Sequence, residues 1–108
     1  MMARGQSDVL VRIKRAAIAG RLVFSEKASI EMEADGITQL DVAESLINAV
    51  AIYKKIRSRS PYRKRATEYL YVIQSTNLDG IFIYTKGRFV RKDELEYFYL
   101  LVSAKRAV

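Results

Sequence analysis

The spacing of apolar residues changes close to residue 50, and this change restricts the fold more than any other feature of the sequence. Before it, apolar side chains recur every three or four residues, as in helices, and after it they alternate, as in strands. Helices followed by strands predict an α+β fold in which N-terminal helices pack on an antiparallel β-meander. We expect a single domain over residues 1–108, with a helical part at about 7–50 and a sheet part at about 51–106.

Local signals predict three helices, over 7–20, 25–35 and about 38–48. Gly20 and Gly36 are the residues expected to end the first two helices, and Ser25 is the expected cap of the second. Thr38 and Asp41 have the spacing of a capping box with Asp in place of Glu. The residues predicted to face the core are Leu10, Ile13, Ala16, Ala17, Ala28, Met32, Val42, Leu46, Ala49 and Val50, with Ile30 as a further candidate in the second helix.

Strands are predicted over 51–56, 67–75, 81–90 and 96–104. If 78–80 is a three-residue hairpin loop with Gly80 in the left-handed conformation, Gln74 lies opposite Tyr84 on the same face. A four-residue turn over 92–95 then pairs Phe82 with Lys105, whose side chain falls on the Tyr84 face. The polar residues expected on that face are Gln74, Tyr84, Lys86, Ser103 and Lys105.

Charge is strongly segregated along the chain. The net charge is +7, yet residues 22–48 hold six acidic residues and one basic residue. The basic residues concentrate in 54–65, which holds no acid: Lys54, Lys55, Arg57, Arg59, Arg63, Lys64 and Arg65. Because Tyr53 and Tyr62 interleave with them, the segment is suited to single-stranded RNA, with cations on phosphates and rings on bases. We expect Arg57, Arg59, Arg63, Lys64, Arg65 and Lys86 to bind RNA.

The chain contains no histidine and no cysteine, which removes several classes of chemistry. Disulfides, thiolate nucleophiles, imidazole bases and metal sites built on these residues are excluded. No N-terminal signal sequence and no run of about 18 apolar residues is present. We therefore expect a cytoplasmic protein that needs no metal or cofactor and does not bind a membrane.

The polar cluster predicted on the sheet is suited to phosphodiester chemistry. RNA carries its own nucleophile, the 2′-hydroxyl, so a catalyst has only to move protons and stabilise charge on the phosphorane. Tyr and Lys can transfer protons when neighbouring cations lower their pKa, and Lys and Arg can hold the phosphate.

Several short motifs occur in order along about 9–106. The first half contributes Phe24-Ser25-Glu26-Lys27-Ala28, Met32, Gly36-Ile37-Thr38 and Asp41-Val42. The second half contributes Tyr71-Val72-Ile73-Gln74, the run from Asp79 to Gly87, and the run from Phe98 to Lys105. Together these motifs resemble a family of small proteins grouped with MqsR-like and BrnT-like toxins. Those toxins resemble RelE-fold messenger ribonucleases of bacterial toxin–antitoxin pairs.

The resemblance implies a metal-independent endoribonuclease that acts with a Lys, a Gln, a Tyr and a second Lys. The Gln, the Tyr and the second Lys match Gln74, Tyr84 and Lys105. The first Lys matches Lys54, and Lys55 is an equally good candidate. The implied partners are RNA and a cognate antitoxin protein.

Two other readings stay open on the sequence alone. The chain is a non-catalytic nucleic-acid-binding module if the same basic segment binds RNA or DNA without turnover. It is a protein-interaction domain if the acidic residues of 26–44 bind a basic partner or a second copy of the chain, as a homo-oligomer.

Overall fold

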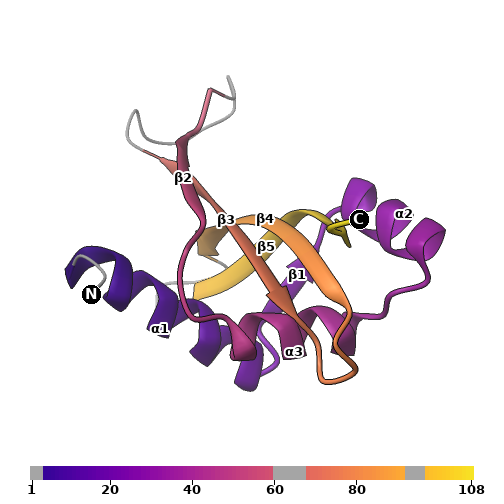
Figure 1. The fold of residues 1–108 in the computed structure, drawn as a ribbon. Helices are drawn as coiled ribbons and strands as arrows, with labels where there is room; N and C mark the ends of the chain where they lie inside the picture. Colours follow the sequence, from indigo (N-terminus) through magenta and orange to yellow (C-terminus); the bar gives the residue numbers. More distant parts are fainter. Residues whose placement is uncertain (1–3, 60–67, 92–96) are drawn as a thin grey trace.

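The fold is α+β, as predicted, with three helices and one five-stranded mixed sheet (Figure 1). The computed structural model describes residues 4–59, 68–91 and 97–108. The elements are α1 (Arg4–Ile18), β1 (Leu22–Phe24), α2 (Glu26–Asp35), α3 (Gln39–Asn48), β2 (Lys54–Arg57), β3 (Tyr69–Thr76), β4 (Phe82–Arg91) and β5 (Tyr97–Arg106). The strand order across the sheet is β1-β5-β4-β3-β2.

The caps of α2 and α3 form as the sequence predicts. The Ser25 side chain accepts a hydrogen bond from the Ala28 backbone N–H at 3.0 Å. The Thr38 hydroxyl accepts from the Asp41 backbone N–H at 3.1 Å, and the Asp41 carboxylate accepts from the Thr38 N–H at 2.8 Å, which completes the capping box. Gly36 has φ of 69°, the left-handed conformation that ends α2.

Strands β2 to β5 form the predicted antiparallel meander, and β1 adds a strand that the sequence did not reveal. β1 pairs in parallel with β5, with Leu22 opposite Tyr99. Three residues are too few to show an alternation of polar and apolar side chains. The strand is therefore defined by its partner, which lies more than seventy residues away in the sequence.

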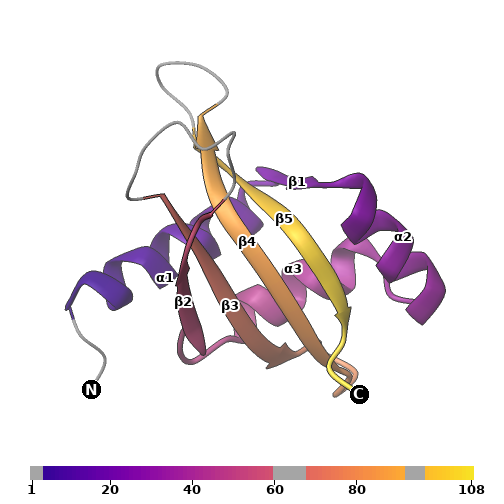
Figure 2. The ribbon, with the colours of Figure 1, turned by 90° about the horizontal axis from the view of Figure 1, so that it is seen from above.

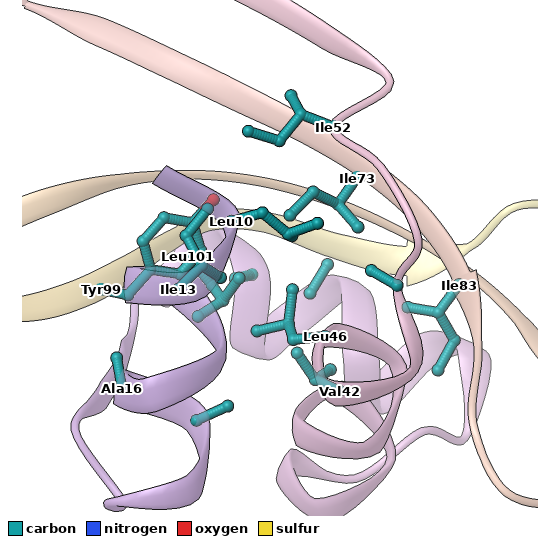
Figure 3. Packing of buried hydrophobic residues seen from close by; sticks show 14 of the residues in the cluster. Leu10, Ile13, Ala16, Val42, Leu46, Ile52, Ile73, Ile83, Tyr99 and Leu101 are labelled. Atoms are coloured by element: carbon teal, nitrogen blue, oxygen red, sulfur yellow. The ribbon is translucent and has the colours of Figure 1, made fainter. Parts of the chain in front are cut away.

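The hydrophobic core lies between one face of the sheet and helices α1 and α3 (Figure 3). Nine of the eleven predicted core residues are buried, and α1 contributes Leu10 and Ile13 while α3 contributes Val42 and Leu46. Ile30 of α2 was a further candidate and is 60% exposed. Val50 was predicted to be buried and is 88% exposed. The reason is that α3 ends at Asn48, so the helical spacing no longer applies to Val50.

The two hairpins of the meander differ in how well their register could be predicted. In the first, Gly80 has φ of 82° and Gln74 pairs with Tyr84, as expected. In the second, Tyr84 pairs with Lys105, so the predicted pairing of Phe82 with Lys105 is wrong by two residues. Lys86 pairs with Ser103 and Gly87 with Leu101, so a bulge at Val102 adds one residue to β5. Lys105 stays on the predicted face because the error is even.

Helix α2 lies beside the outer edge of β5, past the end of β1 (Figure 2). The Glu31 carboxylate accepts a hydrogen bond from the Ala104 backbone N–H at 3.3 Å, and the Asp35 carboxylate accepts from the Arg106 N–H at 2.9 Å. These carboxylates satisfy edge N–H groups that another strand would otherwise pair with.

None of the three helices, within the part of the chain that the structure describes, has the length and apolar character needed to cross a bilayer.

Candidate functional site

Gln74, Tyr84 and Lys105 lie in one row across three adjacent strands, β3, β4 and β5. Directly paired residues of antiparallel strands project to the same face, with Cβ atoms about 5 Å apart. The row lies on the face opposite the core, because its neighbours Ile73, Thr85 and Ala104 are buried on the helix side. The Lys105 Nζ atom lies 5.4 Å from the centre of the Tyr84 ring. We call this surface the open face.

A second row on the open face brings two more lysines close to the first. This row crosses four strands: Lys54 of β2 pairs with Val72 of β3, Val72 pairs with Lys86 of β4, and Lys86 pairs with Ser103 of β5. Val72 is buried but does not belong to the core cluster, which agrees with its place on this face. The ammonium groups of Lys54 and Lys86 therefore border Val72 on either side.

The structure distinguishes Lys54 from Lys55, the two candidates for the first lysine. Lys54 shares the open face with Tyr84, whereas Lys55 projects to the opposite face, where the Nζ atom lies 4.0 Å from the centre of the Tyr69 ring. Strand alternation allows only one of two consecutive residues to join the row. Lys55 is therefore not brought together with Gln74, Tyr84 and Lys105.

Glu31 of α2 is a member of this cluster that the sequence analysis did not single out. One carboxylate oxygen accepts a hydrogen bond from the Ser103 hydroxyl at 2.7 Å, and the other lies 3.9 Å from the Lys105 Nζ atom. The Lys105 ammonium thus lies between Glu31 and the Tyr84 ring. No local signal could have found Glu31, because 72 residues separate it from Ser103.

The predicted RNA-binding residues are spread over both faces of the sheet. Lys86 is half-buried on the open face. Arg57 lies two residues after Lys55 in β2, so it projects to the same side of the sheet as Lys55, the helix side. Arg59 is exposed just beyond the end of β2. The remaining three, Arg63, Lys64 and Arg65, lie outside the described residues.

Ion pairs take up part of the charge on the open face. The Arg88 guanidinium pairs with Glu68 at 2.7 Å, and Lys105 is close to Glu31. For Lys54 and Lys86, no carboxylate of the described residues lies within 4 Å of the ammonium group. On the opposite face, burial raises the pKa of Tyr71 and Tyr99, which keeps both phenols protonated.

The chain matches no protein-family model, and no curated protein or solved structure was found to be similar to it. The resemblance to RelE-fold toxins therefore stays a prediction from the sequence motifs.

The open face combines a phenol, an amide and three ammonium groups in two rows of the sheet, and α2 adds the Glu31 carboxylate beside them. Such a set can bind a phosphodiester through its cations and can exchange protons at the phenol and the carboxylate. A sheet surface also holds these groups more rigidly than a loop would.

Proposed function

We propose that the protein is a metal-independent endoribonuclease that cleaves single-stranded RNA through the RNA's own 2′-hydroxyl. The observation that carries the proposal is the row of Gln74, Tyr84 and Lys105 on the open face, with Lys54 and Lys86 beside it. Two of these lysines have no carboxylate partner in the described chain, so they are available to a phosphate.

The proposed reaction is an in-line displacement at phosphorus. The 2′-oxygen bonds to the adjacent phosphorus while the bond to the 5′-oxygen breaks, giving a 2′,3′-cyclic phosphate and a free 5′-hydroxyl. In our proposal the Glu31 carboxylate accepts the 2′-hydroxyl proton and the Tyr84 phenol donates a proton to the leaving 5′-oxygen. Lys105 suits the phosphate position because it lies between these two groups.

The other polar groups would bind and orient the substrate. Lys54 and Lys86 stabilise the extra negative charge of the phosphorane, and each donor aimed at developing charge is worth roughly 3 kcal/mol. The Gln74 amide orients the ribose or a base next to Tyr84. The basic residues Arg57 and Arg59 follow Lys54 along the chain and would attract the RNA strand toward the site.

The deciding experiment is incubation of the purified protein with a fluorescent single-stranded RNA in excess EDTA. We expect cleavage products that end in 2′,3′-cyclic phosphate, and we expect Tyr84→Phe combined with Lys105→Ala to abolish them. Tyr69→Phe combined with Lys27→Ala removes the same groups elsewhere and serves as the matched control. Equal cleavage by both double variants, or none by the parent protein, would contradict the proposal.

We extend the proposal to a toxin of a toxin–antitoxin pair, on the strength of the motif resemblance. Expression of the chain alone should then arrest growth of a bacterial host, and Tyr84→Phe should relieve the arrest. Salt-sensitive RNA binding without turnover would instead favour a nucleic-acid-binding module that uses the same cations.

A further inference from the structure

Three arginines surround one hollow on the helix side of the sheet, away from the open face. The hollow has a volume of about 200 Å³ and is lined by Arg12, Arg15, Ala16, Arg21, Phe89 and Tyr97. It lies where the second half of α1 passes over the end of β4 and the start of β5. Beside the hollow, the same side of the sheet carries the hydrophobic core, to which α1 and α3 contribute apolar side chains.

The local structure brings these arginines together. Arg12 and Arg15 are three residues apart in α1, which places them on one side of the helix while Ile13 and Ala16 face the core. Gly20, with φ of 72°, turns the chain after α1, and Arg21 follows it directly. This turn places Arg21 beside Arg12 and Arg15, in the lining of the same hollow.

Two of the guanidinium groups are held in place by their neighbours. Arg12 lies 4.1 Å from the centre of the Phe89 ring and 5.2 Å from that of Tyr97. The Arg21 Nε–H donates a hydrogen bond to the Tyr97 backbone oxygen at 3.1 Å. This hydrogen bond does not use the two terminal nitrogens of Arg21. Held side chains lose little conformational entropy when a ligand binds.

The charge of the hollow is one-sided among the residues described. Its lining holds three guanidinium groups and no carboxylate. Positive charges that line the same hollow repel one another, and a bound anion would offset this repulsion. Arginine forms paired hydrogen bonds with the oxygens of a phosphate. A hollow lined by three arginines is therefore suited to bind a phosphate group.

We propose that this hollow, the Arg12–Arg15–Arg21 pocket, binds the phosphate group of a nucleotide, either free or at the 5′ end of an RNA strand. Arg15 and Arg21 bind the phosphate oxygens, and Arg12, stacked on Phe89, supplies the third positive charge. This proposal does not depend on RNA cleavage, since none of the three arginines belongs to the open face.

Calorimetric titration with inorganic phosphate and with adenosine 5′-monophosphate tests the pocket. We expect saturable binding that weakens about tenfold in Arg15→Gln or in Arg21→Gln, the loss typical of one charge-assisted hydrogen bond. Lys27→Gln on α2 removes the same charge from an exposed site and should leave affinity unchanged. The absence of binding, or an equal loss in Lys27→Gln, would overturn the proposal.

The source of the phosphate can be separated in the Tyr84→Phe background, where the proposed cleavage does not interfere. We compare an RNA octamer that carries a 5′-phosphate with the same octamer that carries a 5′-hydroxyl. If the 5′-phosphate octamer binds at least tenfold tighter, and Arg15→Gln abolishes this difference, the pocket binds the 5′ end of an RNA strand. Tight binding of adenosine 5′-monophosphate with no preference between the octamers would identify a free nucleotide. If Arg15→Gln changes neither the affinity for adenosine 5′-monophosphate nor the affinity for the 5′-phosphate octamer, the pocket is not a phosphate site.

Discussion

Tyr99 is the largest side chain that is fully buried, and its hydroxyl has no hydrogen-bond partner among the residues described. Burial raises the pKa of this phenol above its ordinary value, so it is protonated at neutral pH. A buried hydroxyl without a partner carries a desolvation cost of about 1–3 kcal/mol. Tyr99→Phe should therefore leave the free energy of unfolding unchanged or raise it, as measured by urea denaturation. A clear decrease would mean that the hydroxyl has a partner.

The capping carboxylate of Asp41 gives the protein a predictable response to acid. The hydrogen bond from the Thr38 backbone N–H, with further help from Asn77, lowers the pKa of Asp41 below the ordinary 3.8. A lowered folded-state pKa contributes stability at pH values above the unfolded pKa, and this stability is lost as pH falls through the folded pKa. Asp41→Asn should reduce the free energy of unfolding by about 0.3–1 kcal/mol at pH 7, the usual contribution of a negative charge near a helix N-terminus.

The difference between Asp41→Asn and the parent protein should narrow in urea denaturation below about pH 4, because the parent carboxyl then becomes neutral too. A difference that stays constant from pH 7 to pH 3 would contradict a role for the carboxylate charge.

The two consecutive lysines of β2 give a matched test of the open face. Lys54→Met should lower the rate constant for RNA cleavage about 100-fold if its ammonium stabilises the phosphorane. Lys55→Met removes the same charge from the neighbouring position but on the other face, over the Tyr69 ring, and should have little effect on that rate. Similar losses in both variants would mean that only the overall charge of β2 matters.

At the scale of the element, the close packing of β4 against β5 next to the bulge requires a glycine in β4. A Cβ atom on Gly87 would lie 2.6 Å from Tyr99 Cζ and 2.8 Å from the Leu100 backbone oxygen. Neither atom can move freely, since Tyr99 is buried in the core and Leu100 is held in the strand. Gly87→Ala should therefore lower the free energy of unfolding by about 1–3 kcal/mol.

Thermal unfolding measures this loss, and Gly80→Asn serves as the control. Gly80 is the left-handed residue of the first hairpin and has open space around its Cα, and Asn tolerates that conformation. If Gly87→Ala is no less stable than Gly80→Asn, the close approach of Tyr99 is not a constraint.

The elements that could be predicted are those defined by residues close together in the sequence. The Thr38–Asp41 capping box and the hairpin at Gly80 each lie within a few residues, and both form as expected. The β5 bulge and the α2 carboxylates on the β5 edge depend on partners far away in the chain. For the candidate site, strand parity predicted that Gln74, Tyr84 and Lys105 share one face, but it did not predict that Lys105 pairs directly with Tyr84. Glu31 is brought in by packing of α2 alone.

For the molecule as a whole, the distribution of charge predicts how RNA binding depends on salt. Each phosphate contact to a single strand adds about −0.7 to the slope of log K against log salt concentration. Arg59→Gln removes one exposed cation beside β2 and should reduce the magnitude of that slope by about this amount in fluorescence anisotropy. Lys27→Gln, on the acidic α2, should leave the slope unchanged, and an equal change in both variants would contradict a localised contact.

The edge of the sheet that α2 covers carries Glu31 and Asp35, while the opposite edge, at β2, carries Lys54, Lys55 and Arg57. Among these five residues, negative charge lies at one edge of the sheet and positive charge at the other, which contributes a dipole component directed across the strands. In the field of a polyanion such a body experiences a torque as well as an attraction. The protein would therefore turn during its approach, so that β2 arrives first and α2 trails behind.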